Sequence, residues 1–385
     1  MYLKPLVLKK LLGIFLLFHS SVVAAEMIQP SHMQVLQNGK EKDLSVAISK
    51  FKQAMKKQSN NSAGYYEIYQ AYIEQIGVKR IREFLHEQNP ACHGIAHSLG
   101  KVIAEKASDL NSGMRLCSDT CTYGCVHGVF KVYFSRLGED YQIHNHTHKT
   151  HKPMSLNNSA IQQFSQDVNL ACEHSEAIVE DFFKGNCAHG VGHAVAKISD
   201  NAKQASALCK VFAQAVMQYY CETGVFMELA SFLKAEVYKD ETRRSQKTKL
   251  ALPYCEENSF YPSACLRFLL PRNRSLGQIT RYGSICAQQN QKMKQHCFNA
   301  MGYHSRTYVA KNPEEMRYVC SLANSAGAQQ ACISGLAFMK KGQRFRGDIQ
   351  QACVHLHSEA FVTLCRSQSK HYYYDLANQN FAEIL

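Results

Sequence analysis

The sequence predicts an all-α protein made of disulfide-stapled helical-hairpin repeats, arranged as an α-solenoid or a closed α/α array behind an N-terminal helical cap. Three observations lead to this fold: apolar residues recur at helical spacing, cysteines recur in pairs, and the pairs repeat with a period near 33 residues. With 385 residues, the chain can bury a substantial core. We divide it into a leader at 1–25, a cap at 26–90, His- and Cys-rich repeats carrying the site at 91–230, and further Cys-stapled repeats at 231–385.

The first 25 residues have the layout of a secretory signal peptide. Lys4, Lys9 and Lys10 precede the apolar run LLGIFLLF, and a stretch of small residues ending VVAA follows. We expect cleavage after Ala25 and a soluble product, either periplasmic or secreted. No later stretch approaches the roughly 18 apolar residues that a membrane-spanning helix needs.

Residues 26–90 contain no cysteine and show helical periodicity. A first amphipathic helix should end at Gly77, and a second should stop near Pro90. The apolar positions that carry this pattern are Ile68, Tyr69, Tyr72, Ile73 and Ile76 in the first helix, and Val78, Ile81, Phe84 and Leu85 in the second. We interpret the segment as a cap on the repeats.

The cysteines reveal the repeat. All 16 lie beyond the leader, and an even number in an exported chain favours disulfides over zinc clusters, particularly since no CxxC pair occurs. Each unit should be a helix ending near a first cysteine, a short loop, and a helix with the second cysteine near its start. The first members are Cys172, Cys209, Cys255, Cys286, Cys320 and Cys353. The second members, 10 to 15 positions later, are Cys187, Cys221, Cys265, Cys297, Cys332 and Cys365.

Three features depart from the regular repeat. Cys92, Cys117, Cys121 and Cys125 form an irregular first unit, for which we expect the pairs Cys117 with Cys125 and Cys92 with Cys121. The spacing of 44 residues between Cys221 and Cys265 indicates an insertion at the basic run RRSQKTK, residues 243–249, which we interpret as a surface loop. The run HNHTHKTH, residues 144–151, is a second insertion; it could recruit metal loosely or be a solvated segment.

At two of the positions that follow the second cysteine, the repeats hold residues of similar type. The third position is mostly small, which favours close packing of neighbouring helices; it holds Gly128, Gly190, Gly224, Ala300 and Gly335. The second position is always polar and should face away from the disulfide, along one groove of the array. It holds His127, His189, Thr223, Arg267, Asn299, Ser334 and Ser367.

Five histidines suggest a metal site. The phrases CHGIAH, CVHG and CAHGVGH place His93 with His97, then His127, then His189 with His193. Histidines four apart share one helix face, and neutral imidazole is the usual ligand for transition metals. Copper or zinc fits an exported, imidazole-rich site, and iron could also bind. The alternative is that each histidine is a hydrogen-bonded residue in a polar groove.

Carboxylates near the histidines are candidates for proton transfer or for orienting the ligands. Glu222 and Glu228 follow in CETGVFME, and Glu173 and Glu176 lie in CEHSE. Several other chemistries have no motif here: there is no HExxH, no CxxCH and no GxSxG.

The net charge limits the kinds of partner that we expect this protein to bind. Without the leader, the chain carries 41 basic and 31 acidic residues, a net charge of +10. Such a surface could meet an anionic polymer or a membrane surface, or the charge could be dispersed and maintain solubility. The basic run has no interleaved aromatic residues, so no nucleic-acid partner is expected.

Three functions are consistent with the sequence. The first is an exported metal-binding protein, in one form a metalloenzyme, that uses the five histidines. The second is a binding module without catalysis, whose groove, lined by Thr223, Arg267, Asn299 and Ser334, holds a peptide, glycan or protein partner. The third is a purely structural protein of the cell envelope.

Overall fold

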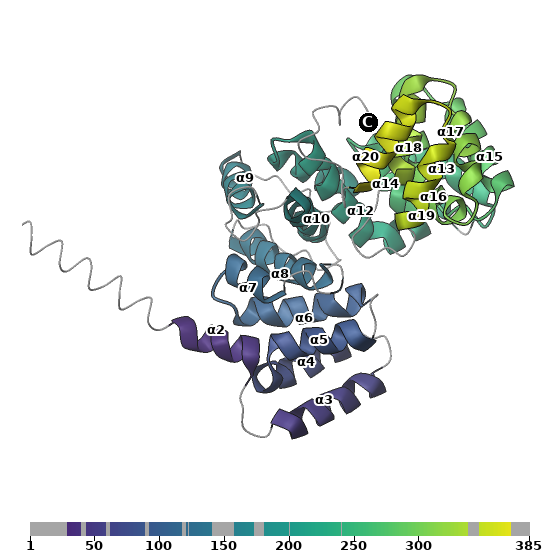
Figure 1. Cartoon of the computed structure of the whole chain (residues 1–385). Helices are drawn as coiled ribbons and strands as arrows, with labels where there is room; N and C mark the ends of the chain where they lie inside the picture. Colours follow the sequence, from purple (N-terminus) through teal and green to yellow (C-terminus); the bar gives the residue numbers. More distant parts are fainter. Residues whose placement is uncertain are drawn as a thin grey trace, which may run out of the picture. The chain divides into compact units, whose positions relative to one another are not determined.

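The computed structural model describes residues 29–39, 44–58, 62–88, 92–117, 121, 123–140, 158–172, 181–199, 201–239, 241–337 and 346–370 (Figure 1). Helices account for the ordered secondary structure of these residues, and no strand occurs among them, so the predicted all-α class is confirmed. The expected leader, the run HNHTHKTH and the carboxylates Glu173 and Glu176 lie outside the described residues.

The chain divides into two compact units, Met1–Cys125 and Val126–Leu385. The first contains α2 (Gln29–Asn38), α3 (Leu44–Lys57), α4 (Ser62–Ile76), α5 (Val78–Gln88), α6 (His93–Lys106) and α7 (Leu110–Cys117). Its core includes Phe51, Tyr69 and Ile73, all of them buried. Gly77 separates α4 from α5, as predicted, and has a φ of 83°, a left-handed conformation that glycine adopts without strain.

The second unit consists of helical hairpins. It contains most of α8 (Gly124–Asp140), then α9 (Asn158–Cys172), α10 (Asp181–Ile198), α11 (Ala202–Leu208), η1 (Cys209–Val211), α12 (Ala215–Tyr238), α13 (Arg244–Asn258), α14 (Pro262–Leu269), α15 (Leu276–Ala287), α16 (Gln291–Val309), η2 (Pro313–Glu315), α17 (Met316–Ser321), α18 (Ala326–Ala337), α19 (Arg346–Ala352), η3 (Cys353–His355) and α20 (Glu359–Lys370). In each hairpin the first cysteine lies at or near a helix end and the second lies within the following helix, as the spacing predicted.

Eight disulfides hold these hairpins and the irregular first unit. The six repeat pairs form as expected, and so do Cys92–Cys121 and Cys117–Cys125. Each repeat disulfide joins residues 10 to 15 positions apart, and a loop of this length is worth about 3 kcal/mol on the chain-entropy model. So many disulfides indicate maturation in an oxidising compartment outside the cytosol. None of the helices in the described part of the chain combines the length and apolar character needed to cross a bilayer.

Small residues let consecutive second helices touch backbone to backbone. A Cβ atom on Gly224 of α12 would lie 1.9 Å from the carbonyl oxygen of His189 in α10. The same contact recurs between α16 and α18, where a Cβ on Gly335 would lie 2.0 Å from the carbonyl oxygen of Asn299. The packing role predicted for the third position is therefore confirmed at these two crossings.

The basic run at residues 243–249 is not a loop, and that prediction was wrong. Helix α13 begins at Arg244, and the inserted residues lengthen α12 to 24 residues and form the first turns of α13. Thr248, Ala251 and Leu252 are buried, and they anchor one face of α13, while Lys249 is exposed. The ammonium group of Lys247 lies 5.1 Å from the ring centre of Tyr238, so this lysine also packs on an aromatic ring.

Candidate metal centre

Three histidines of the second unit converge. His127 lies on α8, while His189 and His193 lie one turn apart on α10, which presents both imidazoles on one face. All three side chains are buried, and one ring nitrogen from each lies within 4.8 Å of the others. The ring centres of His127 and His189 are 4.9 Å apart. The predicted clustering of these three residues is therefore present.

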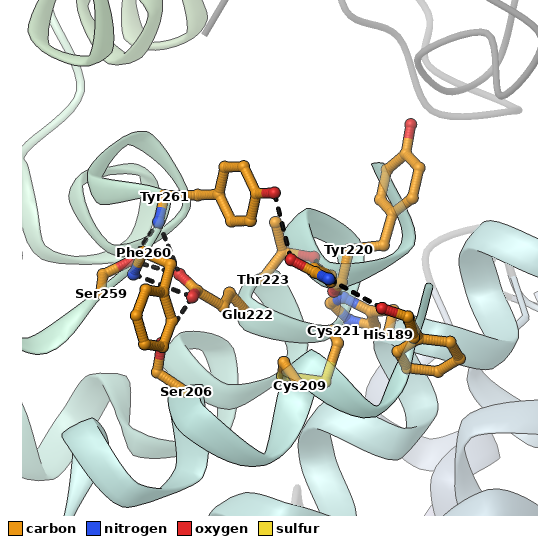
Figure 2. Close-up of a disulfide and its surroundings, with 12 residues drawn as sticks. His189, Ser206, Cys209, Tyr220, Cys221, Glu222, Thr223, Ser259, Phe260 and Tyr261 are labelled. Atoms are coloured by element: carbon orange, nitrogen blue, oxygen red, sulfur yellow. Dashed lines mark hydrogen bonds between the residues drawn. A yellow bond between two sulfur atoms is a disulfide. The ribbon is translucent and has the colours of Figure 1, made fainter. Parts of the chain in front are cut away.

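A hydroxyl group determines which nitrogen of His189 carries the proton. Nδ1 of His189 lies 2.8 Å from Oγ1 of Thr223, and that hydroxyl donates its own hydrogen to the carbonyl oxygen of Tyr220, 2.6 Å away (Figure 2). Because a hydroxyl has only one hydrogen, Thr223 can only accept from His189. His189 therefore carries its proton on Nδ1, and its Nε2 has a lone pair.

A carboxylate determines which ring nitrogen of His193 carries the proton. Nδ1 of His193 lies 2.8 Å from Oε2 of Glu228, whose Oε1 accepts from Lys131 Nζ at 2.8 Å. Burial alone would raise the pKa of Glu228, but the hydrogen bonds and the charge of Lys131 outweigh it and lower that pKa well below its usual range. Glu228 is therefore ionised and accepts the Nδ1 proton, so the lone pair of His193 is also on Nε2.

These two lone pairs face each other. The Nε2 atoms of His189 and His193 are 3.2 Å apart, a distance at which two neutral acceptors repel unless a cation lies between or beside them. His127 directs Nε2 to the amide oxygen of Asn186 at 3.3 Å, and this contact leaves its lone pair on Nδ1. The cluster is thus built to receive positive charge, either a proton or a metal ion.

His93 and His97 form a pair in the first unit. Both lie on α6, are half-buried, and have their Nε2 atoms 3.2 Å apart. Nδ1 of His93 lies 3.2 Å from the carbonyl oxygen of Cys121. A carbonyl oxygen can only accept, so His93 also has its lone pair on Nε2, and the pair offers a two-nitrogen chelate.

The candidate carboxylates have different surroundings. Glu228 contacts His193, as described above. Glu222 is fully buried and points the other way from α12, toward the α11 residue Ser206 and the loop before α14, as Figure 2 shows. Its carboxylate accepts from the hydroxyls of Ser206 and Ser259 and from the backbone amides of Phe260, at 3.0 Å, and Tyr261, at 3.1 Å.

These contacts make Glu222 a structural anchor. Burial raises its pKa, and the four hydrogen bonds oppose that rise. All four donors come from α11 and from the loop between α13 and α14, so the carboxylate ties these elements to α12. The sequence suggested a catalytic role for this residue, but its carboxylate is directed at these donors and not at the histidines.

The polar row is an interface between helices. Thr223, Arg267, Asn299 and Ser334 were expected to line an open groove, yet all four are buried. Asn299, for example, donates from its side-chain amide to the carbonyl oxygen of Ala331 on the next second helix, at 3.1 Å. Gly224 and Gly335 bring α12 against α10 and α18 against α16, so side chains at the second position of these helices are covered by a neighbouring hairpin.

Two residues beside the cluster were not found from the sequence. Lys131 lies four positions after His127 on α8, and helical spacing alone could have indicated it. Asn186 precedes Cys187 by one residue, and no sequence signal distinguishes it from an ordinary polar residue. Thr223 was recognised as part of the row, but its role as the hydrogen-bond acceptor of His189 was not.

The fold and this cluster define a class: a disulfide-rich, all-α helical protein with groups of histidines that could bind metal. Comparison of the chain with protein-family models, with curated proteins and with solved structures finds no match.

Proposed function

We propose that this chain is an exported metal-binding protein that holds a transition-metal ion, copper or zinc, between His127, His189 and His193. The observation that supports it is the pair of facing Nε2 atoms, 3.2 Å apart, whose Nδ1 atoms are both engaged by acceptors. Metal-ligating histidines usually donate their second ring nitrogen to a carboxylate, carbonyl or similar acceptor. Export is supported by the disulfides and by the leader-like first 25 residues.

The donor set fits copper or zinc. Three neutral imidazoles suit both ions, and three protein ligands leave a coordination position for water or another small ligand. A bound ion of this kind would act as a Lewis acid or, for copper, as a redox centre. Glu228 and Thr223 would hold the two α10 imidazoles in orientation, and Lys131 would keep Glu228 ionised and in place.

His93 and His97 form a second, weaker chelate in this proposal. Within the first unit the pair offers two nitrogens, and both rings are half-buried, so we expect lower affinity than at the three-histidine cluster. This pair and the three-histidine cluster can be tested separately, because each has its own variant.

The experiment is elemental analysis of the untagged protein, purified from an oxidising compartment. The parent should carry at least one equivalent of copper or zinc, and His189→Gln with His193→Gln should lose it. His93→Gln with His97→Gln should remove only the weaker fraction. His296→Gln is the control, since His296 is equally buried but hydrogen-bonds only Ser263 among the contacts shown by the described residues.

A parent that binds no copper or zinc after reconstitution would contradict the proposal. So would a His189, His193 double variant that retains the parent's metal content while remaining folded. Loss of metal from the His296 variant as well would show that the readout follows folding and not ligation.

A further inference from the structure

A second candidate site lies away from the histidines, where the start of α13 meets the α14–α15 connection and α15. A cavity of about 370 Å³ opens there, within the usual size range of small-molecule sites. Its walls include Arg243 and Arg281, and none of the residues that line it is acidic. The basic run that the sequence singled out thus begins at the edge of a cavity.

The rim of the cavity is electropositive. Arg281 is exposed, and no carboxylate of the described residues lies within 4 Å of its guanidinium; its Nε contacts the carbonyl oxygen of Gly277 at 3.4 Å. Arg243 shares its charge with Glu241, at 3.1 Å. Helix α13 starts beside them with no side-chain cap and no acidic residue in its first turn, so its positive end also faces this region.

The floor of the cavity combines polar and apolar groups. Thr248, Asn273 and Tyr282 are each 5% exposed or less. The hydroxyl of Tyr282 is buried and has no hydrogen-bond partner within the described part of the chain, which is unusual for a buried polar atom. Pro271 and Ile285 add apolar surface. A ligand that fits would therefore have both a polar and an apolar part.

We propose that this cavity binds a small organic anion: a carboxylate or phosphate group held at the rim by Arg281 and Arg243, and carried on a short apolar body that packs against Tyr282, Pro271 and Ile285. Arginine forms bidentate, charge-assisted hydrogen bonds with both oxyanions, so the shared chemistry is a planar or tetrahedral oxyanion. This site is independent of the proposed metal-binding function and involves none of its residues.

The test is isothermal titration calorimetry, in which benzoate, phenyl phosphate or the neutral benzyl alcohol is titrated into the whole disulfide-bonded protein. The protein is first stripped of metal ions and dialysed into chelator-free buffer, so that binding to a metal ion makes no contribution. We expect saturable binding of one equivalent of at least one anion and none of the alcohol at the same concentrations. The better anion identifies the preferred headgroup.

Two charge-reversed variants make the result specific. R281E should weaken anion binding at least tenfold. R274E reverses another exposed arginine, on the α14–α15 connection, that does not line the cavity, and it should change affinity less than twofold. Absence of saturable binding by both anions, or equal weakening by R281E and R274E, would overturn the proposal.

Discussion

Replacing Thr223 with valine tests whether the hydrogen bond to His189 serves the proposed metal site. Valine keeps the shape and β-branching of threonine but removes the oxygen that lies 2.8 Å from His189 Nδ1. Two things should follow. The buried Nδ1–H loses its acceptor, which costs about 1–3 kcal/mol of folding stability in the metal-free protein. The imidazole is also released to the other tautomer, whose Nε2 carries a proton and cannot bind metal.

The expected loss of metal affinity is about 10- to 100-fold, the usual effect of removing such a partner and equivalent to roughly 1.4–2.7 kcal/mol. It is measured by titrating zinc or copper into the metal-free protein against a chelator of known affinity. Thr223→Ser is the matched control, since it restores the hydroxyl without the methyl group and should remain within a few-fold of the parent. Equal affinities for the valine variant and the parent would refute the tautomer argument. A serine variant as weak as the valine variant would show that packing, and not the hydroxyl, is responsible.

Three further predictions follow from the fold. Glu222→Gln should lower the free energy of unfolding by about 3 kcal/mol in urea titrations. Each carboxylate oxygen of Glu222 accepts two hydrogen bonds, and in glutamine one of these oxygens is replaced by an NH2 group, which donates. The metal content should not change. Gly224→Ala should lower the free energy of unfolding by roughly 3 kcal/mol or more, because its Cβ would collide with the His189 backbone. Gly277→Ala is the control: its Cβ has open space around it, so the free energy of unfolding should stay the same or rise slightly. Equal effects of the two substitutions would contradict the packing argument. Burial lowers the pKa values of His296 and His304 to about 3, so these residues stay neutral in the folded protein while the unfolded chain takes up protons below about pH 6.5. The free energy of unfolding should therefore fall as the pH drops from about 6.5 toward 3, by about 1.4 kcal/mol per pH unit for each histidine. His296→Gln should remove the contribution of one histidine, about 1.4 kcal/mol per pH unit, from this slope, as measured by denaturation curves recorded across this range.

Cysteine spacing predicted the hairpins well because a disulfide between close positions requires the two helices that it joins to be adjacent. The six repeat pairs, 10 to 15 positions apart, follow from that constraint. The two pairs of the irregular unit form as expected but do not follow from it, since Cys92 and Cys121 are 29 positions apart. Composition was less informative for residues 243–249. A polar, basic run indicates exposure, yet it does not indicate the absence of a helix, and burying one face through Thr248, Ala251 and Leu252 was enough to order α13.

The direction of the polar row could be predicted, whereas its burial could not. Helical geometry places the second position away from the disulfide, but whether that direction opens to solvent depends on how closely the next hairpin packs. That distance is set by contacts such as Gly224 against the His189 carbonyl, which involve residues far apart in sequence. The same limit applied to Glu222, whose partners come from two other segments.

The repeat itself explains how the histidine cluster is assembled. His127, His189 and Thr223 occupy the same position in successive second helices, and each contacts the next: the rings of His127 and His189 lie 4.9 Å apart, and His189 is hydrogen-bonded to Thr223. His189 is therefore oriented by the residue at the same position in the next hairpin, whereas His127 is oriented by Asn186, which lies about one turn before that position. A second histidine one turn after His189, His193, adds an imidazole that α12 holds through Glu228. Glycine at the third position keeps the helices close enough for these contacts, so the spacing that packs the array is also the spacing that brings the imidazoles together.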